Sequence, residues 1–128
     1  VLFRSHAYRR ILRLPVVGID HAGRAFLALA VYVRYAGWRD TDELSEVRFL
    51  LRPRDIKRAT VLGLALRLGH TLSGGTAGVV ERTRLQLEKG EIRLMVPRAA
   101  LALVADVVQR RFGELAQAIK QRGRIVAG

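Results

Sequence analysis

Residues 18–37 read GIDHAGRAFLALAVYVRYAG, and this stretch decides the fold. Asp20 lies where its carboxylate can accept hydrogen bonds from the free amide groups of a first helical turn. Gly37 is typical of the residue in a left-handed backbone conformation that ends an α-helix. Nearly every position between them is apolar, and a helix that is apolar all round is buried. Its alanines would let neighbouring helices approach closely. The run is too short, and too closely flanked by Arg24 and Arg34, for a membrane span. The sequence therefore predicts a buried central helix.

Helical patterns lie on both sides of this stretch. A short basic helix is expected over residues 6–14, and Ser45 can begin another that runs through Leu51. Pro53 suits the first turn of a longer helix, because a proline lacks only an amide hydrogen that would be free there anyway. Apolar residues then recur at helical spacing over 54–72. This second main helix is expected to pack against the central one. The Ser-Gly-Gly sequence at 73–75 is expected to terminate it after Leu72.

The last third of the chain changes pattern. Two alternating runs, 83–88 and 91–96, flank Lys89-Gly90, which predicts a β-hairpin. A lone hairpin is only marginally stable, so a helical layer should cover its apolar face. An amphipathic helix follows over 106–121, with Gly123 ending it and a loose tail beyond. The expected fold class is mainly α within α+β: a helical bundle with one small hairpin between the penultimate and last helices.

Composition narrows the classes of protein. Half of the residues are hydrophobic, which is enough for a core, and the absence of cysteine excludes disulfides and thiolate metal sites. No signal peptide or long apolar run is visible, which favours the cytoplasm and no membrane association. The first five residues, VLFRS, resemble a translated adapter. We expect residues 1–5 to be a non-native leader and residues 6–128 to be one domain that is truncated at its N-terminal side.

The chain is strongly basic, with a formal charge of +12 that comes almost entirely from arginine. Planar guanidinium groups suit phosphate oxygens, so one interpretation is a polyanion partner. The other is an arginine-rich composition with solvated basic faces, and the sequence leaves both open. If the two ends of the domain converge, the candidate polyanion-binding residues are those clustered near its start and its end: Arg9, Arg10, Arg13, Arg24, Arg110, Arg111 and Lys120.

Residues for catalysis or metal binding are scarce. The histidines His6, His21 and His70 lie on separate segments without a paired spacing, so no metal site is predicted. The Gly-rich run at 73–78, SGGTAG, lacks the lysine of a phosphate-binding P-loop and follows a helix rather than a strand. Serines and threonines lie where helix capping explains them, so no catalytic residue is predicted either.

Two stretches together resemble a known family. They are GIDHAGRAFLALAVYVRY at 18–35 and RDIKRATVLGLALRL at 54–68, the latter continued by GHTLS at 69–73. They are similar to helices in the C-terminal domain of the exopolyphosphatase / guanosine pentaphosphate phosphatase family, especially its alphaproteobacterial type. The hairpin and a closing Arg-Arg-Phe helix follow in the family's order, so the resemblance covers about residues 6 to 121.

The resemblance implies an HD-like helical domain that follows an actin-like phosphatase domain. The parent protein would be an enzyme that hydrolyses phosphoric anhydrides, with Mg²⁺ as the family's cofactor and polyphosphate or guanosine pentaphosphate as substrate. An HD metal site needs a carboxylate where this chain has the 69–73 run, which contains none. The chain itself is therefore expected to be a non-catalytic accessory domain, without a cofactor of its own, that binds polyanions and makes interdomain or dimer contacts.

Two alternatives stay open at this point. One is a basic helical protein that binds nucleic acid, although the chain has no helix-turn-helix spacing, no zinc finger and few aromatic residues for base stacking. The other, less favoured, is an HD-type metal-dependent phosphohydrolase. We also expect the chain to self-associate or to be only marginally stable, because the resemblance places further helices before His6 and their loss would leave apolar surface near Phe26, Val33 or the 54–72 helix uncovered.

Overall fold

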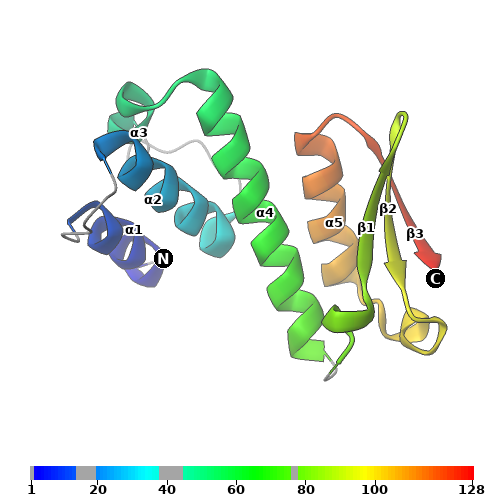
Figure 1. Ribbon diagram of the computed structural model, residues 1–128. Coiled ribbons are helices and arrows are strands. Elements are labelled where there is room, and N and C mark those ends of the chain that lie inside the picture. The colour runs from blue at the N-terminus through cyan, green and yellow to red at the C-terminus, as the bar shows by residue number, and fades with distance from the viewer. Residues whose placement is uncertain (1, 14–19, 38–44, 76–77) are drawn as a thin grey trace. The chain divides into compact units, whose positions relative to one another are not determined.

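The structure is a computed structural model that describes residues 2–13, 20–37, 45–75 and 78–128 (Figure 1). The chain divides into two compact units, Val1–Arg67 and Leu68–Gly128, which we call the N-terminal unit and the C-terminal unit. Helix α4 (Pro53–Gly75) crosses the boundary between them. The fold is mainly helical with a small sheet, as the sequence predicts.

The N-terminal unit is helical. It contains α1 (Leu2–Arg13), α2 (His21–Ala36), α3 (Ser45–Leu50) and the first part of α4. The short basic helix was expected to begin at His6, but α1 begins at Leu2. The end of α3 agrees with the sequence within one residue, and Pro53 is the first residue of α4 as expected. Helix α4 was expected to stop at Leu72, but it continues to Gly75, through the Ser-Gly-Gly run.

Both predicted ends of the central helix are confirmed. The Asp20 carboxylate accepts a hydrogen bond from the Gly23 amide at 2.7 Å. Gly37 has φ +73°, and its amide donates to the Val33 carbonyl at 2.8 Å. The next two carbonyls, of Arg34 and Tyr35, accept hydrogen bonds from the Arg67 guanidinium on α4, at 3.1 and 2.7 Å. A cation from a second helix therefore satisfies the last turn of α2, where the helix dipole also favours positive charge.

The close approach that the alanines of α2 predict occurs at Gly63 of α4. A Cβ atom at that position would lie 2.6 Å from both the Ala30 carbonyl oxygen and the Val33 Cβ. Ala28, Ala30 and Val33 are buried, with at most 2% of their surface exposed. The expectation that the second main helix packs against the central one is confirmed. Of the places where uncovered apolar surface was expected, Val33 is buried against α4, whereas Leu62 and Leu66 of the 54–72 segment are 40% and 47% exposed.

The C-terminal unit is built on a three-stranded sheet in the order β1-β2-β3. Strands β1 (Arg84–Glu88) and β2 (Glu91–Val96) form the predicted antiparallel hairpin, with the left-handed Gly90 at its turn. A 3₁₀ turn, η3 (Arg98–Leu103), and helix α5 (Asp106–Ala118) follow. Figure 1 shows α5 lying along one side of the sheet.

The loose tail expected after the last helix is wrong. Residues Arg122–Ala127 form β3, which pairs in parallel with β2. A parallel neighbour needs a long crossover connection, and η3 and α5 supply it. Helix α5 also ends earlier than Gln121. The Gln121 amide donates to the Ala116 carbonyl and the Lys120 amide to the Gln117 carbonyl, both at 3.0 Å. This is a Schellman stop in which Lys120, at φ +56°, takes the place usually held by glycine.

One face of the sheet packs on α5. A Cβ on Gly123 would lie 3.0 Å from the Phe112 ring and 3.1 Å from the Ala116 methyl group, so this side of β3 faces the helix. Cross-strand partners share a face, which places Ile92, the partner of Gly123, on the same side. The core of the unit gathers here and is buried: Leu72, Ile92, Leu94, Val96, Val108, Phe112, Leu115 and Ala116. The expected cover over the hairpin is incomplete, because all five residues of β1 are exposed.

Candidate functional site

The predicted polyanion-binding residues fall into two groups, one in each unit. Arg9, Arg10 and Arg13 lie on α1 and are exposed. Their spacings of three and four residues put them on one side of that helix. The sequence of α1 contains no acidic residue. None of the three forms an ion pair with another residue that the structure describes, where the recorded pairs join Arg93 to Glu88 and Glu91. These guanidinium groups are therefore available to an anion.

Arg24 differs from the other members of its group. It lies in the first turns of α2, which packs beside α1, and it is half-buried. Its Nε atom is buried and has no hydrogen-bond partner among the described residues. Packing therefore restricts the surface that Arg24 can offer, and α1 presents most of the positive charge in this group.

In the C-terminal unit the structure separates two arginines that are adjacent in sequence. Arg110 is exposed on α5. Arg111 is half-buried, and its guanidinium donates a hydrogen bond to the Thr71 hydroxyl on α4. Arg111 therefore ties α5 to the last turns of α4, a structural role that sequence reasoning missed. Arg110 remains the accessible cation of the pair.

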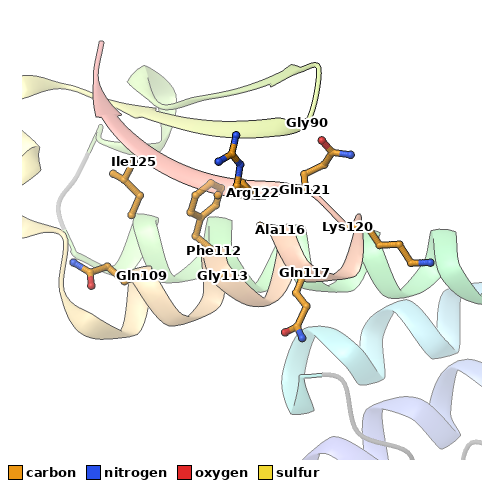
Figure 2. Close-up of a pocket in the computed structure, with 11 residues that line it drawn as sticks. Gly90, Gln109, Phe112, Gly113, Ala116, Gln117, Lys120, Gln121, Arg122 and Ile125 are labelled. Carbon is orange, nitrogen blue, oxygen red and sulfur yellow. The ribbon is translucent and has the colours of Figure 1, made fainter.

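Lys120 lies beyond the end of α5, at a shallow hollow of about 850 Å³ between that helix and β3 (Figure 2). The wall consists of Gly90, Gln109, Phe112, Gly113, Ala116, Gln117, Lys120, Gln121, Arg122, Gly123 and Ile125. It includes two cations and no carboxylate. These two cations, Lys120 and Arg122, give the hollow a basic character that suits an anion. The Gln121 Oε1 atom is buried without a hydrogen-bond partner among the described residues, and as an acceptor it suits a donor group rather than an anion.

The side chains around the hollow do not converge on one point. In Figure 2, Arg122 and Gln121 extend on the side of the Gly90 turn, whereas Lys120 and Gln117 extend in other directions. Arg110 and Arg111 are not part of the wall. The hollow is therefore a basic depression and not a pocket closed around a small molecule. Arg122, which belongs to the same basic cluster near the end of the sequence although the candidate set stopped at Lys120, also lies in the wall.

The remaining titratable residues that the structure describes were considered as possible metal ligands. Among the residues that the structure describes, no three histidine, aspartate or glutamate side chains come close enough together to share a metal ion. His21 and His70 are exposed, on α2 and α4. The pKa of Arg93 is raised, first by its hydrogen bond to Glu91 and then by the charge of Glu88. That shift strengthens a cation that is already charged and creates no acid or base.

Comparison with known proteins gives one clear match. A family model described as "Exopolyphosphatase, C-terminal" matches residues 6–126, which is nearly the whole chain. No curated protein matches the chain. Within the parts of the chain that the structure describes, no helix is both long and apolar enough to cross a membrane.

Proposed function

Because this chain belongs to the exopolyphosphatase C-terminal family, we propose that it binds the polyanionic substrate for an upstream catalytic domain in the cytoplasm. Polyphosphate is the preferred ligand, and guanosine pentaphosphate is the second. The chain breaks no bond itself. It holds the anion and contacts the upstream phosphatase domain and a second copy of the same protein.

The observation that carries the proposal is the state of the arginines on α1. Arg9, Arg10 and Arg13 are exposed, lie on one side of the helix and have no acidic partner among the described residues. A linear polyphosphate carries a regularly spaced row of negative charges, so a row of free guanidinium groups on a rigid helix matches it. Arg24 adds positive charge on the neighbouring helix α2. In the C-terminal unit, Arg110 and the hollow with Lys120 offer a second basic surface.

The first prediction tests this surface. The full chain should bind fluorescently labelled polyphosphate, with an affinity that falls steeply as salt is raised, because each phosphate contact releases counterions. The double variant Arg9→Ala/Arg13→Ala should weaken binding and lower the slope of log affinity against log salt by roughly 1 to 2, since two contacts are lost. Fluorescence anisotropy over a salt series measures both quantities.

The matched control is Arg54→Ala/Arg58→Ala. Both arginines are exposed on α4, so the control loses the same charge at a different surface. Equal weakening by the two double variants would mean diffuse attraction, and the proposed surface would be wrong. Arg110→Ala tests the C-terminal unit without disturbing the bond between Arg111 and Thr71. Tight binding of duplex DNA with a sequence preference would favour the nucleic-acid alternative instead.

A further inference from the structure

Strand β1 is an open edge whose backbone groups can be assigned. The Arg122 amide donates to the Gly90 carbonyl at 3.2 Å, and the Gly128 amide donates to the Val96 carbonyl at 2.9 Å. Backbone groups alternate sides along a strand, so Ile92, Leu94 and Val96 face β3 and the residues between them face β1. Given the register of the hairpin, Arg84, Gln86 and Glu88 bond to β2. The amides and carbonyls of Leu85 and Leu87 therefore point away from the sheet.

The side chains of the same two residues are also without cover. Leu85 and Leu87 are the cross-strand partners of Leu94 and Ile92, so they lie on the face of the sheet that packs on α5. Leu94 and Ile92 are buried, but Leu85 is 48% exposed and Leu87 is 67% exposed. The apolar face of the sheet thus continues past the edge of its helical cover. An edge with free backbone groups and exposed leucines can accept another strand.

We propose that β1 pairs with β1 of a second copy of this chain, antiparallel, with Gln86 opposite Gln86. In this register Leu85 lies opposite the partner's Leu87, and these are the residues whose backbone groups point outward, so they can exchange hydrogen bonds. The two-fold axis runs perpendicular to the sheet, so the leucine faces of the two copies coincide. The two three-stranded sheets become one sheet of six strands, and four leucines form a continuous apolar strip.

Charge supports this register above the neighbouring ones. Arg84 lies opposite the partner's Glu88, and the second pair repeats this contact by symmetry. Arg84 has no ion-pair partner among the described residues. Glu88 contacts Arg93 of its own chain at 3.2 Å, and its side chain is still 43% exposed. If the two-fold axis were shifted to Leu85 or to Leu87, Gln86 would lie opposite Arg84 or Glu88. In either register, Arg84 would no longer lie opposite Glu88.

The other edge of the sheet provides a contrast. Strand β3 carries Arg122 and Arg124 and no acidic residue. Pairing two copies of β3 about Arg124 would place like charges opposite each other, which is how natural sheets protect an edge. Strand β1, with the sequence RLQLE, favours pairing instead. When two copies lie antiparallel, the arginine at the start of one strand attracts the glutamate at the end of the other.

This inference rests on the dimer contact of the proposed function, and its test measures association without polyphosphate, so its failure would leave the binding proposal intact. Sedimentation velocity of the 128-residue chain should show a monomer–dimer equilibrium. Arg84→Glu should weaken the dimer roughly tenfold, because two attractive pairs become repulsive. Glu88→Arg should do the same. An equimolar mixture of the two variants should associate about as tightly as the unchanged chain, because both pairs between positions 84 and 88 in the mixed dimer are again of opposite charge.

The matched controls are Arg98→Glu and Asp106→Arg, which make comparable changes in charge at exposed sites outside β1 and the residues next to it. Both should dimerise like the unchanged chain. Glu88→Arg also removes a contact with Arg93, so Leu87→Lys serves as a second test that touches no ion pair. It should weaken the dimer, whereas Leu101→Lys should not. A monomer at all concentrations, unchanged association of Arg84→Glu, or a mixture no tighter than its components would each overturn the proposal.

Discussion

The two units use glycine differently to bring elements together. In the N-terminal unit, Gly63 of α4 lies against the backbone of α2, and an added Cβ would meet the Ala30 carbonyl oxygen at 2.6 Å. In the C-terminal unit, Gly123 of β3 lies against side chains of α5, and an added Cβ would meet Cε2 of the Phe112 ring at 3.0 Å. A carbonyl oxygen moves only with its helix, whereas an aromatic ring can shift by small torsions. The contact between α4 and α2 at Gly63 should therefore tolerate an added methyl group less well than the contact between β3 and α5 at Gly123.

The largest effect is expected at Gly63. Gly63→Ala should lower the free energy of unfolding by about 3 kcal/mol, because α4 and α2 must separate to admit the methyl group. Urea denaturation followed by circular dichroism measures the loss. Gly69→Ala is the control, since Gly69 lies in the same helix with nothing within 4 Å of the added atom. It should raise the free energy by about 0.5–1 kcal/mol through helix propensity. A neutral Gly63→Ala would contradict the close approach.

A smaller effect is expected at Gly123. Gly123→Ala should cost at most about 1 kcal/mol, because the Phe112 ring and the Ala116 methyl need to move by only a few tenths of an ångström. Gly113→Ala is its control on α5, where the added atom meets nothing within 4 Å. The same denaturation experiment ranks the four variants. If Gly123→Ala were as damaging as Gly63→Ala, the distinction between a backbone contact and a side-chain contact would fail.

Local signals made much of the fold predictable. Asp20 and Gly37 fixed both ends of α2 because capping depends on the nearest turn alone. The alternation around Lys89-Gly90 gave the hairpin, since its strands are neighbours in sequence. Strand β3 escaped prediction because its partner β2 lies about thirty residues earlier. RGRIVA is also a weak strand pattern, with two arginines and a glycine in six residues. Its pairing is visible only once α5 has returned the chain to the sheet.

The candidate site was less predictable, because the positions of charges depend on packing. Arg110 and Arg111 are neighbours in sequence, yet one is exposed and the other bonds to Thr71, forty positions earlier. Nothing in the local pattern separates them. Arg9, Arg10 and Arg13 were easier to place, since their shared helix puts them on one side whatever it packs against. Whether they bind polyphosphate remains a proposal that the salt series tests.

The two units also differ in the type of residue that ends a helix. Both helices stop at a residue with positive φ, which is Gly37 in one unit and Lys120 in the other. Glycine adopts this conformation without steric cost, whereas a lysine Cβ crowds the following carbonyl. The Schellman hydrogen bonds of Gln121 and Lys120 hold α5 to its stop in spite of that cost.

The smallest expected effect is therefore a gain in stability at Lys120. Lys120→Gly should raise the free energy of unfolding by up to about 1 kcal/mol, since it removes the strain and keeps both amide hydrogen bonds. Glycine also has more freedom in the unfolded chain, which offsets part of the gain. The mirror change, Gly37→Ala, should lower the free energy by about 1 kcal/mol or more, because alanine is strained at φ +73°. Urea denaturation compares the two. A loss of stability in Lys120→Gly would show that the lysine side chain contributes more to the fold than its backbone strain removes.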